Sequence, residues 1–286
     1  MLKTRIMTAA IGLPAVVALF AYGPKWLLIL IFLVFVGLSA YETTPLLIPR
    51  ISKIFSDLAG KESSIRDEWF QPLAIVLSLI LFVASSAGPW QGAHGMLVVA
   101  LTGTMVLGLF SSRCVEIAMG RSAGLLLTVC YSSLPWLAIW DLYLMGDGSR
   151  YVMFLLAAVW SGDTGAYFGG LKFGKHKLAP TISPKKTWEG AVAGLVASIA
   201  GGYVLNLFYS WSGAPLGQNQ TVIAASLVGG VLGQMGDLFE SLFKRFAGVK
   251  DSGTIFPGHG GFLDRVDGLM FAAPVIWFIF HTFNHV

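Results

Sequence analysis

Acidic side chains gather near the C-terminal end of this chain, in a segment where they alternate with cations and glycines. Five of the 15 Asp and Glu residues lie between positions 237 and 267. They are Asp237, Glu240, Asp251, Asp264 and Asp267. Helical spacing aligns Asp237 with Glu240 and Ser241, and Asp264 with Asp267. Hard divalent cations bind oxygen ligands, so two such carboxylate pairs facing each other predict a metal site.

The cations and glycines of the same segment have the properties of a phosphate site. The glycines let backbone amides approach an anion closely, and the cations supply charge that binds phosphate. The residues are Lys244, Arg245, Lys250, Arg265, Gly258, Gly260 and Gly261. A cytoplasmic anchoring loop with a flexible turn would explain the lysines alone, but not the acids at both ends. His259, between glycines and beside two carboxylates, is a further functional candidate.

A second basic segment covers residues 172–186. Lys185 and Lys186 stand at the start of an apolar run, where they would lie at the level of lipid headgroups. Ser183 and Pro184 resemble the start of a helix. The other lysines of this segment are explained as anchors that keep the loop on the cytoplasmic side.

Asp163 lies within an apolar run, in a Gly-rich stretch at 161–170. An ionisable group inside a membrane span is costly and marks function by default. The polar interruption predicts a broken or cavity-lining helix. The alternative is that Asp163 pairs with one buried lysine.

The segments between these motifs are so apolar that they are expected to lie in a lipid bilayer. Hydrophobic residues make up 55% of the 286 residues, charged residues only 12%, and the mean hydropathy is +0.72. We therefore predict an all-α polytopic integral membrane protein with about nine transmembrane helices. The predicted spans are 6–23, 25–41, 70–88, 93–112, 122–142, 151–171, 188–209, 220–238 and 266–283. The first run is interpreted as a retained helix and not as a signal peptide, because a second run follows almost at once.

The distribution of basic residues gives the orientation. With the N-terminus in the cytoplasm, 17 of the 19 Lys and Arg residues fall on the inner side, and only Lys25 and Arg150 fall outside. This split is the one that the positive-inside rule requires. It places both motif segments on the cytoplasmic face.

We predict two regions without a soluble domain. Residues 1–150 hold about five transmembrane helices and a cytoplasmic loop at 42–69, which Pro45 and Pro49 open and whose residues 51–58 lie on the membrane surface. Residues 151–286 hold about four helices and the catalytic site. No nucleic-acid partner is expected.

These motifs resemble the phosphatidate cytidylyltransferases, also called CDP-diacylglycerol synthases. The family signature matches from Ser241 to Asp267, as S-L-F-K-R, four residues, then K-D-S-G-T-I-F-P-G-H-G-G-F-L-D-R-V-D. Gly236–Ser241, Ser183–Gly190 and Asp163–Tyr167 are similar to further family elements. The resemblance covers residues 155–285, and the first 150 residues share only their apolar spans with the family.

The resemblance implies a reaction in which CTP and phosphatidic acid give CDP-diacylglycerol and pyrophosphate with Mg²⁺, with room for a second metal ion. It implies an enzyme of the bacterial inner membrane, embedded in lipid, whose active site faces the cytoplasm and which forms a homodimer. We expect Asp237 and Asp264 to be the chief metal ligands, followed by Glu240, Asp251 and Asp267. The catalytic group expected here is Asp237, Asp264, Lys250, Asp251, His259 and Arg265. The phosphate-binding group is Lys185, Lys186, Ser241, Lys244, Arg245, Gly258, Gly260 and Gly261.

Three other functions are compatible with parts of this pattern. A transporter would explain an intramembrane acid. Transporters, however, place their substrate site near the membrane midplane and are often built from inverted repeats. In this sequence the charged residues gather at one face of the membrane and no repeat is evident. An enzyme that uses a CDP-lipid as donor would need Ala-Arg after its Asp-Gly, and Asp267-Gly268 lacks it. A lipid scaffold would not need so many acids at one depth.

Overall fold

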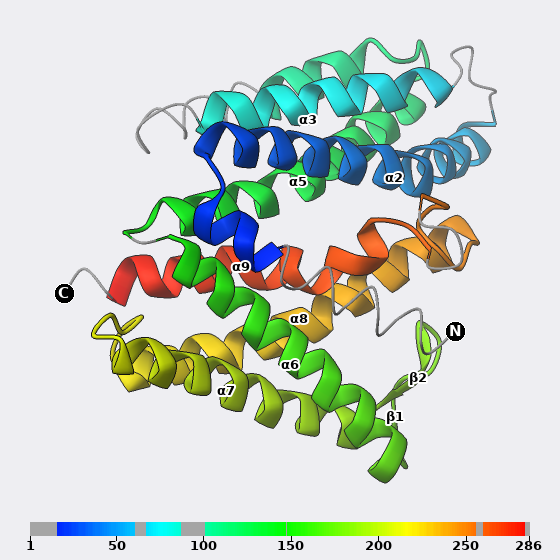
Figure 1. The fold of residues 1–286 in the computed structure, drawn as a ribbon. Coiled ribbons are helices and arrows are strands. Elements are labelled where there is room, and N and C mark those ends of the chain that lie inside the picture. Colours follow the sequence, from blue (N-terminus) through cyan, green and yellow to red (C-terminus); the bar gives the residue numbers. More distant parts are fainter. Residues whose placement is uncertain (1–15, 61–66, 87–100, 147, 256–259, 284–286) are drawn as a thin grey trace.

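The computed structural model describes residues 16–60, 67–86, 101–146, 148–255 and 260–283, and this part of the chain is almost entirely helical (Figure 1). The long helices are α2 (Lys25–Ala59), α3 (Phe70–Ser86), α5 (Val115–Leu144), α6 (Ser149–Phe173), α7 (Trp188–Trp211), α8 (Asn219–Ala247) and α9 (Leu263–Phe283). The short elements are the 3₁₀ helix η1 (Asp67–Trp69) and the antiparallel strands β1 (Lys177–Ala179) and β2 (Ser183–Thr187). Residues 16–22 and 101–109 are also helical.

The helices form two groups with α9 between them. Helices α2, α3 and α5 pack on one another, while α7 contacts both α6 and α8, and α9 packs against α8 and α5 (Figure 1). Aromatic rings fill the first group: Phe32 stacks on Phe82 with ring centroids 5.9 Å apart and meets Trp136 edge-on. The β1–β2 hairpin, the N-terminal end of α9 and the C-terminal end of α2 lie at one end of the molecule (Figure 1).

The predicted spans agree with the helices over most of their length. Six segments among the described residues are long and apolar enough to cross a membrane: α2, η1 with α3, α5, α7, α8 and α9. The predicted spans at 6–23 and 93–112 lie partly outside the described residues. Helix α6 is continuous from Ser149 to Phe173, so the predicted break around Asp163 is wrong.

The cytoplasmic loop predicted at 42–69 is wrong over most of its length, because α2 continues as a helix to Ala59. Proline has no N–H, so Pro45 leaves the carbonyl of Tyr41 without its helical donor. The side-chain amide of Gln71 on α3 donates to that carbonyl at 2.9 Å. A neighbouring helix thus replaces the lost hydrogen bond, which is how a proline is tolerated within a membrane helix.

The end of the same region is fixed by a buried arginine. Arg121 on α5 is fully buried, forms an ion pair with Asp67 at 2.6 Å, and donates to the carbonyl of Ser111 at 2.8 Å. Its guanidinium also lies 5.0 Å from the ring centre of Phe70. Asp67 and Phe70 are therefore part of the packed structure.

Glycines bring the helices of the second group into close contact. A Cβ atom at Gly236 on α8 would lie 2.4 Å from the carbonyl oxygen of Asp267 on α9, so only glycine fits there. The adjacent Asp237 is thereby held beside the first turns of α9. Ser183 and Pro184 do not begin a helix as predicted, since they lie in β2; α7 begins at Trp188 and is capped by Thr187, which accepts from Gly190 N at 3.2 Å.

Candidate active site

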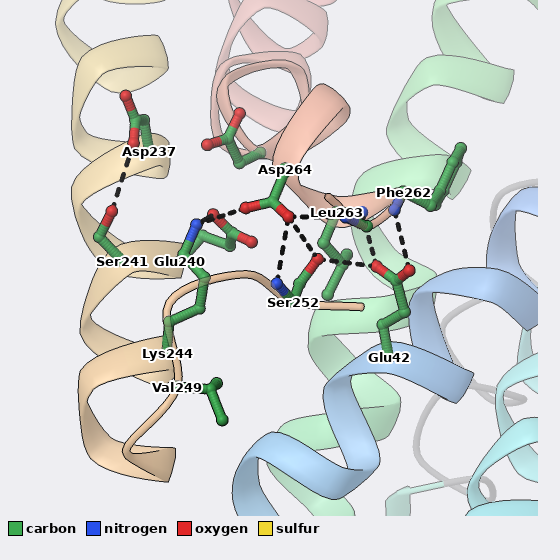
Figure 2. Close-up of polar contacts among 12 residues, drawn as sticks. Glu42, Asp237, Glu240, Ser241, Lys244, Val249, Ser252, Phe262, Leu263 and Asp264 are labelled. Atoms are coloured by element: carbon green, nitrogen blue, oxygen red, sulfur yellow. Dashed lines mark hydrogen bonds and ion pairs between the residues drawn. The ribbon is translucent and has the colours of Figure 1, made fainter. Parts of the chain in front are cut away.

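The predicted site residues meet at the end of the molecule that carries the hairpin. They come from the C-terminal half of α8, the loop 248–262 and the first turns of α9 (Figure 2). Asp163 of α6 and Lys186 of β2 join them from the other side, as their charges interact with Asp237 and with each other. Residues up to about 100 positions apart in the sequence therefore lie together at this end of the molecule.

Lys244 links the two helices at the centre of the site. Its ammonium lies 2.5 Å from Oε2 of Glu240, one turn earlier on α8, and 2.5 Å from Oδ1 of Asp264 on α9 (Figure 2). Glu240 is fully buried and Lys244 nearly so. Charge pairs removed from water need such close partners, and loss of one would leave the other uncompensated. The predicted phosphate ligand Lys244 therefore already binds two of the predicted metal ligands.

Asp264 organises the loop that precedes its own helix. Its Oδ2 accepts from Ser252 N at 3.1 Å and from Gly261 N at 2.8 Å, and it lies 3.0 Å from Ser252 Oγ. Gly260 has φ +82°, a conformation that glycine adopts at little cost. The amide of Gly261, predicted to bind phosphate, is thus directed at Asp264.

Asp237 is more open than Glu240 and Asp264. Its side chain is 42% exposed, its Oδ2 lies 2.8 Å from the ammonium of Lys186, and Ser241 Oγ donates to its Oδ1 at 3.4 Å. Lys186 also donates to the backbone carbonyl of Gln234 at 3.2 Å. These contacts fix β2 against α8 and leave one side of Asp237 accessible.

The ionisable groups nearest Asp237 are mostly acidic. Asp267 experiences the charges of Asp237 and Asp163, and it accepts from the amide of Gly268 at 2.7 Å. Five carboxylates therefore share this region with two ammonium groups. The carboxylates are Asp163, Asp237, Glu240, Asp264 and Asp267, and the ammonium groups are those of Lys186 and Lys244. A cation would offset the surplus.

The residues fit Mg²⁺ in chemistry. In the part of the chain that the structure describes, no three acidic, histidine or cysteine side chains converge into a ready metal cage. Every candidate ligand is nevertheless a carboxylate oxygen, as Mg²⁺ prefers. Glu240 Oε1 is buried and has no hydrogen-bond partner among the described residues. An unpaired buried carboxylate oxygen is costly, and a bound cation would satisfy it.

The remaining predicted residues lie around this centre. Arg245 is exposed and donates to the carbonyl of Ile182 in the hairpin turn at 3.3 Å, which ties the hairpin to α8. Lys185, Lys250, Asp251 and Arg265 are also exposed. Gly258 and His259 lie outside the described residues.

A glutamate of the second motif holds the hairpin in place. The carboxylate of Glu189, at the start of α7, accepts from the amide of Lys175 at 3.0 Å and lies 2.6 Å from Nδ1 of His176. Glu189 therefore has a positional role, and the acid that follows Lys185 and Lys186 in the sequence serves to anchor the strand that carries them.

One buried acid at the site was missed by the sequence analysis. Glu42 of α2 accepts from the amides of Phe262 and Leu263, both at 2.9 Å, at the start of α9 (Figure 2). It was assigned to the loop 42–69. The available signal was an acid within or next to an apolar span, the same signal that drew attention to Asp163.

Comparison with known proteins identifies the family of this chain. The model of the Cytidylyltransferase family matches residues 3–283. A phosphatidate cytidylyltransferase of Staphylococcus epidermidis is 37% identical over 202 residues, covering 69% of this chain and 74% of the relative. The enzyme of the same name from Brucella suis is 49% identical over 137 residues, covering 47% of this chain and 49% of the relative. Since the family model spans nearly the whole chain, this protein belongs to the cytidylyltransferase family.

Proposed function

We propose that the cluster around Asp237, Lys244 and Asp264 is the site at which this enzyme transfers CMP from CTP to phosphatidate, giving CDP-diacylglycerol and pyrophosphate. Family membership and the names of the relatives support the CTP-dependent reaction in phospholipid synthesis. The observation that supports the site is the surplus of carboxylates over ammonium groups at one end of α6, α8 and α9. Both substrates are polyanions, so a site of this charge needs a bound cation to receive them.

The reaction needs positioning more than it needs a strong base. The phosphate monoester of phosphatidate is already largely ionised near pH 7, because its second pKa is about 6. One of its oxygens attacks the α-phosphorus of CTP, a new P–O bond forms, and the bond to the β-phosphate breaks and releases pyrophosphate. No proton has to be removed from the nucleophile in this state.

We assign metal binding to Asp237, Glu240, Asp264 and Asp267, with Asp163 as a further candidate. Mg²⁺, when bound, would neutralise the phosphates and polarise the reacting phosphorus, and a second metal ion is compatible with five carboxylates. Asp237 is open to a cation, while Glu240 and Asp264 share Lys244. Lys185, Lys186, Lys250, Arg245 and Arg265 surround this centre and are proposed to hold the triphosphate and the lipid phosphate, with Asp251, His259 and the signature glycines beside them.

The proposal also includes the orientation of the chain in the membrane. Nine spans with a cytoplasmic N-terminus would place the hairpin and the loop 248–262 at the inner face of the bacterial inner membrane, next to cytoplasmic CTP and membrane phosphatidate. The proposal includes a homodimer, which chemical cross-linking in membranes would detect.

The site assignment is tested by Asp237→Asn in purified enzyme with labelled CTP and phosphatidate. We expect activity to fall below a few per cent at every Mg²⁺ concentration, and wild-type activity to disappear on chelation and return with Mg²⁺. Asp57→Asn, an exposed acid near the C-terminal end of α2, is the matched control and should remain active. An Asp237→Asn enzyme with near wild-type turnover would refute the assignment.

A further inference from the structure

Glu42 lies on α2, more than 200 residues before the residues that it contacts. Its Oε1 accepts from Phe262 N at 2.9 Å, and its Oε2 accepts from Leu263 N and from Ser252 Oγ, both at 2.9 Å (Figure 2). The side chain is 1% exposed. The N-terminal part of the chain therefore reaches the signature segment through this carboxylate.

The surroundings of Glu42 consist of hydrogen-bond donors, which suit a carboxylate and not merely a side chain of this size. Among the described residues no Lys, Arg or His forms an ion pair with it, so the amides at the start of α9 and one hydroxyl compensate the carboxylate. A helix N-terminus carries unpaired N–H groups and a partial positive charge, and both favour an anion there. The carboxylate in turn satisfies two donors that would otherwise be buried without partners.

Two glycines of the signature make room for this carboxylate. A Cβ atom at Gly253 would lie 2.4 Å from Glu42 Oε1, and one at Gly261 would lie 2.5 Å from Glu42 Oε2. Any side chain at either position would displace Glu42 or the loop. These glycines thus belong to the contact with α2, although glycines in such a motif suggest a phosphate loop.

A single residue connects Glu42 to the proposed metal ligands. Ser252 Oγ lies 2.9 Å from Glu42 Oε2 and 3.0 Å from Asp264 Oδ2, and its backbone N–H also donates to Asp264. Asp264 in turn contacts Lys244, and Asp267 lies on the next part of the same helix. A shift of Glu42 would therefore move the first turn of α9 and both of its acids.

We propose that Glu42 is a positioning residue of the transfer site, which fixes the signature loop and the first turn of α9 so that Asp264 and Asp267 keep their places opposite Asp237. This inference rests on the proposed function, because it assigns Glu42 an effect on the acids that are proposed to hold the metal. Glu42 itself contacts neither the proposed metal ligands nor the reacting groups.

The test is Glu42→Gln, which keeps the shape but places an N–H₂ donor against a backbone N–H donor at one of the two oxygen positions. We expect kcat to fall by at least about tenfold, the effect of losing one hydrogen bond to a charged group. We also expect the Mg²⁺ concentration for half-maximal rate to rise by about fivefold or more. This second quantity does not depend on how many molecules are folded, so a purely structural role would leave it unchanged.

Ser52→Ala is the matched control. Ser52 is also buried on α2, and its hydroxyl donates to Asp67 Oδ1 at 3.0 Å and accepts from Arg121 Nε at 3.2 Å, on the side of α2 that packs against η1 and α5. Its loss should lower thermal stability and leave the half-saturating Mg²⁺ concentration within about twofold of wild type. If Glu42→Gln yields too little folded enzyme, Gly253→Ala pushes a methyl group onto Glu42 Oε1 and should give the same rise.

A cycle with Ser252→Ala tests the connection. If Glu42 acts through Ser252, the double variant should lose much less than the product of the two single losses. A half-saturating Mg²⁺ concentration like that of wild type in both Glu42→Gln and Gly253→Ala would overturn the inference, as would fully multiplicative losses. Failure of the proposed function would be seen separately, as an active Asp237→Asn enzyme.

Discussion

The cations of the signature differ in what they contact. Lys244 is buried between Glu240 and Asp264, and Arg245 holds the hairpin turn. Lys250 is exposed beside Asp251 in the loop that ends at α9. Of these three cations, Lys250 is the one that the arrangement leaves most open to a phosphate group.

Replacing Lys250 with alanine should therefore cost more than replacing Lys175. A hydrogen bond to a charged group is worth roughly 1.5–3 kcal/mol, so Lys250→Ala should lower kcat/KM by about 10- to 150-fold. Lys175 binds Glu189 through its backbone N–H, which alanine retains, and its exposed ammonium should contribute little. Lys175→Ala should thus change activity by less than about threefold. Steady-state kinetics with CTP and phosphatidate varied separately would measure both; equal losses would contradict the assignment.

At the scale of elements, the two prolines of α2 show why the sequence suggested a loop. Proline usually ends a helix, and Pro45 and Pro49 follow an apolar run and precede mixed charges. The helix continues because Gln71, a residue of another helix, supplies the missing donor to Tyr41. Such compensation depends on tertiary contacts and cannot be predicted from the local pattern.

This explanation makes a prediction about Gln71. Gln71→Met should lower the free energy of unfolding by about 0.5–1.5 kcal/mol, since it removes the hydrogen bond to the carbonyl of Tyr41. In a Pro45→Ala background the same substitution should cost much less, because alanine, unlike proline, has a backbone N–H that can donate to Tyr41. Thermal unfolding in detergent of the wild type, the two single variants and the double variant would give the coupling free energy between Gln71 and Pro45. An equal loss of stability from Gln71→Met in both backgrounds would show that Gln71 does not support the helix at Pro45.

The hairpin is a second case in which local sequence was insufficient. Ser183 and Pro184 are common at helix starts, yet α7 begins later, at Trp188. The segment 177–187 is too short and too polar to show the alternation of a strand. Its position depends on Glu189 and Arg245, which hold its backbone from outside.

At the scale of the whole molecule, the sequence predicted those site residues whose position depends on the order and direction of the membrane spans. Counting spans and basic residues brought Asp163, Asp237, Asp264 and Asp267 to one end, and the structure brings them together there. Glu42 was not predictable in this way, because its partners are backbone amides and a serine hydroxyl. Backbone N–H groups are present at almost every residue, so the pattern of charged residues in the sequence does not reveal which of them bind a carboxylate.

The orientation itself can be tested by labelling single cysteines in intact cells. The background replaces the two free cysteines, Cys114 and Cys130, with serine. We expect a membrane-impermeant maleimide to label Ser212→Cys, at the end of α7. Lys175→Cys in the hairpin segment and Val249→Cys after α8 should react only after lysis. Labelling of the latter two in intact cells would mean that the site faces outward.

The contact between Glu42 and α9 also has a consequence for the time course of biosynthesis. Glu42 and Leu263 are 221 residues apart. At typical rates of about 5–20 residues per second, the ribosome needs about 10–45 s to add this length. For most of that interval α2 is complete, but its carboxylate lacks the amides that bind it in the finished protein. A buried, uncompensated charge is unfavourable, so we expect the inner end of α2 to stay hydrated during synthesis and to dock only when the last span has been inserted.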